Sequence, residues 1–196
     1  MARVLSSAAQ TEERFTVERY FALVGEGVLQ PDDRVELLEG VIVAMSPQNP
    51  SHASSTNRAF RALVRAVGTR AVVRGQSPLV IGRHSVPEPD VAIVPGREID
   101  YDQAHPTTAI LVVEVADSSL LQDRLTKAAI YAAAEIPEFW IINLRDQCVE
   151  IHRDPDARAR RYRTVRTARR SERIKLAALP AVSVAVRDLL PARHSP

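Results

Sequence analysis

Two nearly continuous apolar segments on either side of a helical pattern most limit the folds open to this chain. The segments 110–116 (ILVVEVA) and 139–144 (FWIINL) are rich in β-branched and aromatic residues, as strands covered on both faces usually are. Between them, 123–135 has apolar residues at helical spacing. A helix between two buried strands is the usual crossover that joins parallel neighbours. The sequence therefore predicts an α/β fold built on a mixed sheet.

Three helices are predicted from apolar spacing and from the residues that can cap them. Thr16 is expected to cap a helix over 17–24, and Ser51 is expected to cap a helix over 52–67. The third helix is the crossover over 123–135. The residues expected on the core sides of the first and third helices are Tyr20, Phe21, Leu23, Leu125, Ala128, Ala129, Tyr131 and Ala132.

Shorter β-like runs complete the predicted order. The runs 34–38 and 41–46 are joined by Glu39-Gly40 and predict a hairpin. A second hairpin is expected to pair 161–165 with 173–176, and 149–152 is expected to pair with 139–144. The other expected elements are strands at 71–74, 78–81 and 91–94, and a strand or short helix at 181–190.

The chain length suits one domain. Of the 196 residues, 1–14 are polar and small and are expected to fray, and 15–190 are expected to form a single domain with a basic hairpin around 153–175. The segment 153–175 carries ten basic and three acidic residues, whereas the whole chain has a formal net charge of only +2. An acidic body with one strongly basic segment is compatible with DNA as a partner.

Several classes of protein are excluded by what the sequence lacks. The single cysteine, Cys148, cannot form an internal disulfide and excludes a Cys-rich zinc module. No apolar run reaches the length of about 18 residues that a membrane span needs, and the start of the chain has no signal-peptide pattern. We therefore expect a cytoplasmic protein without a membrane partner. There is also no P-loop and no complete dinucleotide-binding fingerprint.

Two carboxylates at predicted strands point to a metal site. Glu114 lies inside the apolar run ILVVEVA, where a carboxylate is rare unless it is paired or holds a metal. Asp90 directly precedes the strand at 91–94 and follows Pro-Glu-Pro. Each has a plain alternative, because Glu114 could reach solvent or an arginine and Asp90 could be a turn residue. Together they would form a hard-oxygen site suited to Mg²⁺ or Mn²⁺.

Further candidates lie near these carboxylates in the predicted order. Lys127 stands one turn into the helix after Glu114, where it could orient a water or stabilise phosphoryl charge, or could simply be a solvated lysine. Glu36, with Glu39 close by, could add a metal ligand or form a salt bridge at the rim. His52 and Gln76 are weaker candidates for substrate binding.

Four ordered motifs carry a resemblance to a known family. They are RVELLEGVIVAMSPQNPSH, VPEPDVAIV, LVVEVADSS and DRLTKAAIYAAAEIPEFWIIN, and they extend over about 15–190. In this order and spacing they resemble the Uma family of restriction-endonuclease-like proteins, within the PD-(D/E)XK nuclease superfamily. The resemblance implies a restriction-endonuclease-like core, a mixed β-sheet flanked by α-helices.

The resemblance also implies roles for individual residues. Asp90 and Glu114 match the family's Asp and Glu, and Glu36 matches its upstream Glu. The parent motif has a lysine two residues after the Glu, where this chain has Ala116, and the family moves that lysine to the next helix, where Lys127 stands. The chain departs from the family at 117–118, after the expected strand at 110–116, and at 134–136, where the expected crossover helix ends.

These observations lead to one hypothesis and two alternatives. The leading hypothesis is a Mg²⁺- or Mn²⁺-dependent endonuclease that hydrolyses DNA phosphodiester bonds, with Asp90, Glu114 and Glu36 as metal ligands and Lys127 as a catalytic residue. The alternatives are a non-catalytic nucleic-acid-binding or protein-interaction module of the same fold, and a small-molecule phosphohydrolase. A homodimer is expected, because two active sites most simply cut two strands.

The basic segment supplies the expected contacts to DNA. In Arg161-Tyr162-Arg163, alternation along a strand places both arginines on one face, from which they could bind phosphates. The alternative is a solvated hairpin in a protein that uses arginine for almost all of its basic residues. No groove-reading motif is present, so the sequence predicts no target specificity.

Overall fold

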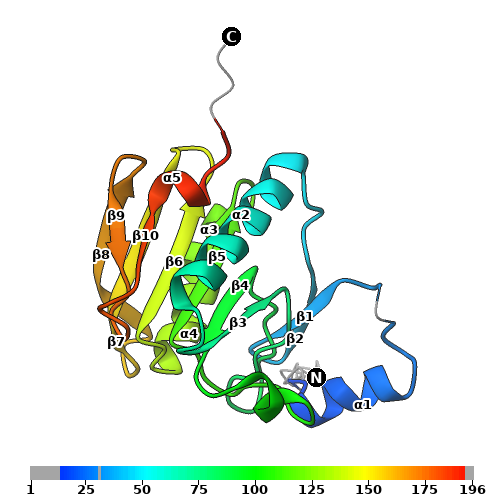
Figure 1. Cartoon of the computed structure of the whole chain (residues 1–196). Coiled ribbons are helices and arrows are strands. Elements are labelled where there is room, and N and C mark those ends of the chain that lie inside the picture. Colours follow the sequence, from blue (N-terminus) through cyan, green and yellow to red (C-terminus); the bar gives the residue numbers. More distant parts are fainter. Residues whose placement is uncertain (1–13, 31, 193–196) are drawn as a thin grey trace, which may run out of the picture.

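A six-stranded mixed sheet forms the centre of the protein, in a computed structural model that describes residues 14–30 and 32–192. The strand order is β3-β4-β5-β6-β7-β8, and only β5 and β6 run parallel. Figure 1 shows this sheet with helices on both faces. The strands are β3 (Val72–Gly75), β4 (Val91–Val94), β5 (Leu111–Ala116), β6 (Glu138–Asn143), β7 (Cys148–Asp156) and β8 (Arg161–Arg169).

Helices cover the two faces of the sheet through two separate apolar clusters. On one face, α2 (Pro50–Val67) and α5 (Val186–Leu189) pack on alternate residues of β4 and β5, such as Ile93 and Val113. On the other face, α4 (Ala128–Ala133) packs on the intervening residues, such as Ala92 and Val112. Every residue of β4, β5 and β6 is buried. This confirms the expected α/β architecture with central, doubly covered strands.

The crossover between β5 and β6 is helical, as expected, but it is not one regular helix. It consists of α3 (Leu120–Gln122), a π-helical turn η2 (Asp123–Lys127) and α4. A π turn inserts an extra residue per turn, so residues before it rotate relative to those after it. The prediction that Leu125 faces the core is therefore wrong, since its side chain is 63% exposed, while Asp123 and Lys127 are buried.

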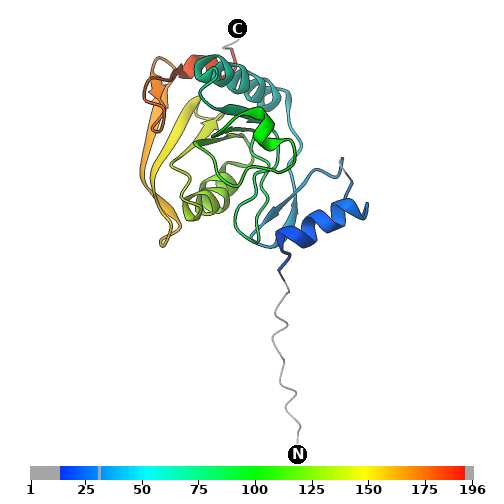
Figure 2. The ribbon, with the colours of Figure 1, turned by 60° about the horizontal axis from the view of Figure 1, so that its bottom comes forward.

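The N-terminal elements form a smaller layer beside the sheet. Helix α1 (Val17–Gly25) begins after Thr16, which caps it as predicted. It packs on the two-stranded sheet of β1 (Val35–Leu38) and β2 (Val41–Ala44), the hairpin expected from the sequence. Figure 2 shows α1 at the edge of the molecule, away from β7 and β8. Of the residues expected on its core side, Phe21 is only half-buried.

Two local predictions, on the cap of helix α2 and on the segment 78–81, are wrong. Helix α2 is capped by Asn49 instead of Ser51, because the Asn49 side chain accepts a hydrogen bond from the His52 amide and Pro50 occupies the first turn. The expected strand at 78–81 is a loop, with one isolated bridge between Ile81 and Ser85. The chain reverses between those two residues, so no longer ladder forms.

The expected pairing of 161–165 with 173–176 is also wrong. Strand β7 is longer than predicted and continues to Asp156, so that β8 pairs with β7 in the main sheet. The segment after β8 forms β9 (Arg173–Lys175), which pairs with β10 (Ser183–Ala185). The last expected element, at 181–190, is therefore both a strand, β10, and a short helix, α5.

The remaining described element is a 3₁₀ turn, η1 (Glu98–Tyr101), within the expected loop between β4 and β5. Within the described ranges, none of the helices combines the length and the apolar character that a membrane crossing requires.

Candidate active site

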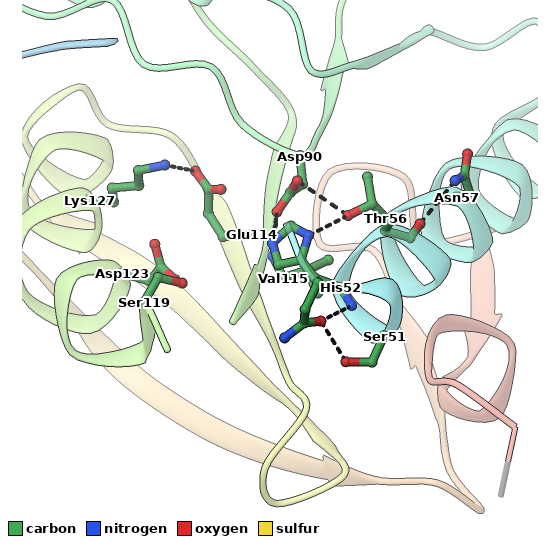
Figure 3. A network of polar contacts seen from close by, with 12 residues as sticks. Ser51, His52, Thr56, Asn57, Asp90, Glu114, Val115, Ser119, Asp123 and Lys127 are labelled. Atoms are coloured by element: carbon green, nitrogen blue, oxygen red, sulfur yellow. Dashed lines mark hydrogen bonds and ion pairs between the residues drawn. The ribbon is translucent and has the colours of Figure 1, made fainter. Parts of the chain in front are cut away.

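Asp90 is fixed at the junction of the sheet and helix α2. It directly precedes β4 and is only 6% exposed. Its Oδ2 accepts a hydrogen bond from the Val115 amide of β5 at 2.8 Å, and its Oδ1 accepts one from Thr56 Oγ1 at 3.2 Å. His52 Nε2 lies 3.3 Å from Oδ2. Figure 3 shows the Asp90 carboxylate between β5 and the first turns of α2.

Lys127 lies between two buried carboxylates. Its Nζ donates to Glu114 Oε1 at 3.1 Å and lies 3.3 Å from Glu36 Oε1. Glu36 comes from β1 and Glu114 from the middle of β5, and all three side chains are less than a tenth exposed. The structure thus brings together Glu36, Glu114 and Lys127 from three distant parts of the sequence, next to Asp90.

Two further polar residues of this site were not found from the sequence. Tyr131, expected only as a core residue, is fully buried, and its hydroxyl donates to Glu114 Oε1 at 2.8 Å. Asp123 is buried, and its Oδ2 accepts a hydrogen bond from Ser119 Oγ at 2.8 Å. Asp123, Lys127 and Tyr131 are spaced four residues apart, which was the signal that they share one side of the crossover.

Burial controls the protonation of this cluster. It raises the pKa of Glu114 from 4.5 to about 8, despite the opposing charge of Lys127. It also raises the pKa of Asp123 from 3.8 to about 6, again against Lys127. Burial acts to lower the pKa of Lys127, but the carboxylates of Glu114, Glu36 and Asp123 outweigh it and hold that pKa above its usual value. Lys127 is therefore a permanent cation here.

His52 belongs to the same electrostatic system. Burial would lower the pKa of its imidazole, but the hydrogen bond to Asp90 and the Asp90 charge outweigh burial and raise it. The imidazole Nδ1 lies 3.5 Å from Thr56 Oγ1, so His52 and Thr56 both orient Asp90. The prediction of His52 near the site agrees with this placement, and substrate binding by His52 stays a prediction.

The donor set of the cleft fits a divalent cation. Five carboxylates line one small cleft of about 60 Å³: Glu36, Glu88, Asp90, Glu114 and Asp123. The positive side chains that line it are those of Lys127, Arg34 and, when protonated, His52. Burial and the neighbouring carboxylates keep the pKa values of Glu88 and Glu114 raised, as is expected where negative charge exceeds positive charge.

The geometry limits how a metal could be held. Within the described residues, no three His, Cys, Asp or Glu side chains meet as a complete metal-binding cluster. Mg²⁺ needs no such cage, because it is commonly bound by one or two carboxylates and completes its octahedron with water and substrate phosphate. Lys127 pairs with both Glu36 and Glu114. Asp90 lies next to the β5 residue that follows Glu114, because its Oδ2 accepts a hydrogen bond from the Val115 amide, whereas Glu36 comes from the separate β1–β2 sheet. Asp90 and Glu114 are therefore the two carboxylates at adjoining strands of the main sheet.

The other predicted substrate-binding residues lie away from the cleft. Gln76 lines a separate, larger cavity. Glu39, which the sequence offered as a possible metal ligand, pairs with Arg160 in the turn between β7 and β8. In the sheet register, the residue of β8 in the row of Glu114 is Thr167, so Arg163 and Arg161 lie four and six residues from that row. Arg163 is also paired with Asp156.

A different set of arginines lies on α2, the helix that brings His52 to the cleft. Arg58, Arg61 and Arg65 are exposed on α2, and their spacing places them on one stripe. They line a surface hollow that also contains Ser54 and Asn57. The first turn of α2 places His52 next to Asp90. From the rise per residue of an α-helix, Arg58 is about 9 Å farther along the helix axis than His52. This stripe was not predicted from the sequence.

Comparisons with known proteins agree with this architecture. The model of the Uma2 family, described as "Putative restriction endonuclease", matches residues 17–187. A crystal structure of a putative nuclease belonging to DUF820 from Anabaena variabilis ATCC 29413 has a similar fold, with a TM-score of 0.67 and 13% sequence identity. The match covers 89% of this chain and 97% of that chain. No match was found among curated proteins. The family expected from the four motifs is thereby confirmed.

Proposed function

Because this chain belongs to the Uma2 family of putative restriction endonucleases, we propose that it is a divalent-metal-dependent nuclease that hydrolyses phosphodiester bonds of DNA. The observation that carries the proposal is the position of Lys127. A buried ammonium group 3.1 Å from Glu114 and 3.3 Å from Glu36, in a cleft that Asp90 also lines, is an arrangement for stabilising negative charge. A phosphodiester develops such charge when it is attacked.

In this proposal four side chains of the site have defined roles. Asp90 and Glu114 hold Mg²⁺ or Mn²⁺. The bound cation would polarise a phosphoryl oxygen and lower the pKa of a coordinated water. Lys127 stays protonated, so it donates hydrogen bonds to the attacking water or to the phosphoryl oxygens and does not act as the base. Tyr131 also fixes the Glu114 carboxylate, by donating a hydrogen bond to the same Oε1 atom that accepts from Lys127.

The substrate class is tested by comparing three phosphate esters. Purified protein with Mg²⁺ or Mn²⁺ is incubated with supercoiled plasmid, with a nucleoside triphosphate and with p-nitrophenyl phosphate. The proposal predicts nicked or linear plasmid with 5′-phosphate ends and no turnover of the small esters. Turnover of the small esters alone would support the phosphohydrolase. Plasmid binding without cleavage, by a protein that binds no metal, would support the non-catalytic module.

The stability of the metal-free protein is expected to fall as pH rises toward 8. Burial raises the pKa of Glu114 from 4.5 to about 8, so the folded state binds its proton more tightly than the unfolded chain does. The resulting stabilisation is complete below about pH 4.5 and is lost as pH approaches 8. Urea unfolding midpoints of wild type and Glu114→Gln should therefore converge or cross between pH 5 and 8, because the glutamine has no proton to lose.

The effect of a divalent metal on the melting temperature is a second test of the titration of Glu114. A divalent cation bound to Glu114 would compete with the proton of that carboxyl, so Mg²⁺ or Mn²⁺ should raise the melting temperature of wild type more at pH 8.5 than at pH 6. Glu114→Gln should lose most of this effect. The urea unfolding midpoints of the two proteins could instead change with pH in parallel, and metal could raise both melting temperatures equally. In that case Glu114 is neither the titrating group nor a metal ligand.

The arginine stripe on α2 is expected to contact DNA phosphates. Each phosphate contact contributes about 0.9 to the slope of log affinity against log salt concentration. Removing two of them with Arg58→Ala and Arg61→Ala should lower that slope by about 2 units. The measurement is binding of a labelled duplex at several salt concentrations.

The matched comparison is the double variant Arg161→Ala and Arg163→Ala, since phosphate binding by those two residues is also a prediction. A change of slope only in this second variant would place the phosphate contacts on β8. The expected homodimer is tested in the same samples by sedimentation with and without DNA.

A further inference from the structure

A cavity between α1 and the loops that flank the sheet lies beside the cleft. Its volume is about 370 Å³, against about 60 Å³ for the cleft. Its walls include Tyr20 and Phe21 from α1, Gln76 after β3, and His105 from the loop before β5. Because these residues play no part in the mechanism above, the cavity calls for a separate explanation.

The cavity and the cleft share a wall. Arg34, Met45 and Glu88 line both of them. The backbone amide of Glu88 donates to Glu36 Oε2 at 3.2 Å, so the shared wall is tied to the carboxylate that pairs with Lys127. A group bound in the cavity would therefore be next to a phosphate bound in the cleft.

The cavity wall combines flat aromatic faces with hydrogen-bonding side chains. Phe21 and His105 are stacked, with ring centroids 5.6 Å apart and planes inclined by 17°. Burial and the charge of Arg74 lower the pKa of His105, so its ring is mainly neutral near pH 7. Gln30, Gln76 and Glu88 place amide and carboxylate groups on the same cavity.

This combination matches one component of a nucleic acid. A nucleobase has two flat faces that stack on aromatic side chains, and edges that carry hydrogen-bond donors and acceptors. A phosphate would leave the aromatic faces unused. Enzymes that act on DNA can also hold a base that has left the helical stack in such a pocket.

We propose that this cavity, which we call the base pocket, holds one nucleobase of the DNA strand, displaced from the stack beside the phosphate in the cleft. The inference rests on the proposed nuclease function and specifies its substrate as a strand with a displaced base. It also gives Gln76 a role: a contact to the edge of a base and not to a phosphate.

The test compares strands with and without bases. The ligands are a 20-residue thymidine oligonucleotide and a 20-residue oligonucleotide of abasic tetrahydrofuran units, which keeps the phosphates. Binding is measured with Ca²⁺, a larger cation that uses the same oxygen ligands as Mg²⁺. Wild type should bind the thymidine strand at least about fivefold more tightly, because stacking of one base contributes about 1 kcal/mol or more.

Variants test whether the preference for the thymidine strand depends on residues that line the base pocket. Phe21→Ala should remove most of the fivefold preference and leave affinity for the abasic strand unchanged. Gln76→Gly should reduce the preference in part, and glycine tolerates the positive φ of 44° at this position. Val28→Ala is the control, because Val28 is 63% exposed near α1 and does not line the cavity.

Each other outcome overturns the base pocket. If wild type binds both strands equally but cuts plasmid, the nuclease stands and the pocket does not take a base. If thymidine alone at millimolar concentration binds in a Phe21-dependent way while the two strands bind equally, the cavity takes free nucleosides. If neither strand binds and plasmid is not cut, the proposed function fails together with the pocket.

Discussion

Replacing Asp90 with asparagine is expected to lower DNA cleavage by more than about 100-fold. Loss of a group that only orients a metal ligand already costs about 10- to 100-fold in affinity or activity, and Asp90 is proposed to be a ligand itself. The amide keeps the shape of the side chain and an oxygen that can accept from the Val115 amide. Cleavage, Mn²⁺ affinity and melting temperature are measured on the same preparation.

The matched control for Asp90→Asn is Glu39→Gln. Glu39 is a carboxylate of the β1–β2 turn that pairs with Arg160 and does not line the cleft. This variant should cleave DNA and bind Mn²⁺ as wild type does. Unchanged Mn²⁺ affinity in Asp90→Asn would contradict the metal assignment even if cleavage were lost.

Lys127→Met is expected to separate catalysis from metal binding. Cleavage should fall by about 100-fold or more, because the only buried ammonium group that lines the cleft is gone. Mn²⁺ affinity should be equal or higher, since removing a positive charge near Asp90 and Glu114 favours a cation. This opposite pair of effects distinguishes a charge-stabilising lysine from a residue that merely holds the fold.

Lys127→Met should also reduce stability. Breaking a buried ion pair by removing one partner typically costs about 3–5 kcal/mol. We expect a cost at the lower end, because Glu114 can take up a proton at neutral pH. Lys175→Met is the control, since Lys175 is the only other lysine and is exposed on β9. If Lys127→Met cleaves DNA at the wild-type rate, the lysine has no catalytic role.

The central part of the fold was predictable because burial leaves a strong pattern in sequence. The residue types in the segments that form β4, β5 and β6 favour buried strands over other structures. A helical segment between β5 and β6 is typical of a crossover between parallel strands, and these two strands are parallel. Glu114 stood out because it is a carboxylate in such a run. The structure then placed Lys127 and Glu36 close to it and Asp90 at the adjoining strand, while their roles stay a prediction.

What could not be predicted depends on contacts that a linear pattern does not record. A π turn displaced Leu125 from the core, and nothing in the residue types of 123–127 marks it. The extension of β7 to Asp156 decided the partner of β8, since pairing is a competition between strands. Tyr131 satisfied every criterion of a core residue, and only the buried Glu114 beside it reveals its polar role.

The most direct measurement is cleavage of supercoiled plasmid by the purified chain with Mg²⁺ or Mn²⁺, beside samples with EDTA and with Asp90→Asn. The proposed metal-dependent nuclease should give nicked or linear plasmid only where both the metal and Asp90 are present. Equal cleavage in EDTA or by Asp90→Asn would contradict the proposed metal site. No cleavage by a wild-type protein that also binds no metal would contradict the nuclease itself.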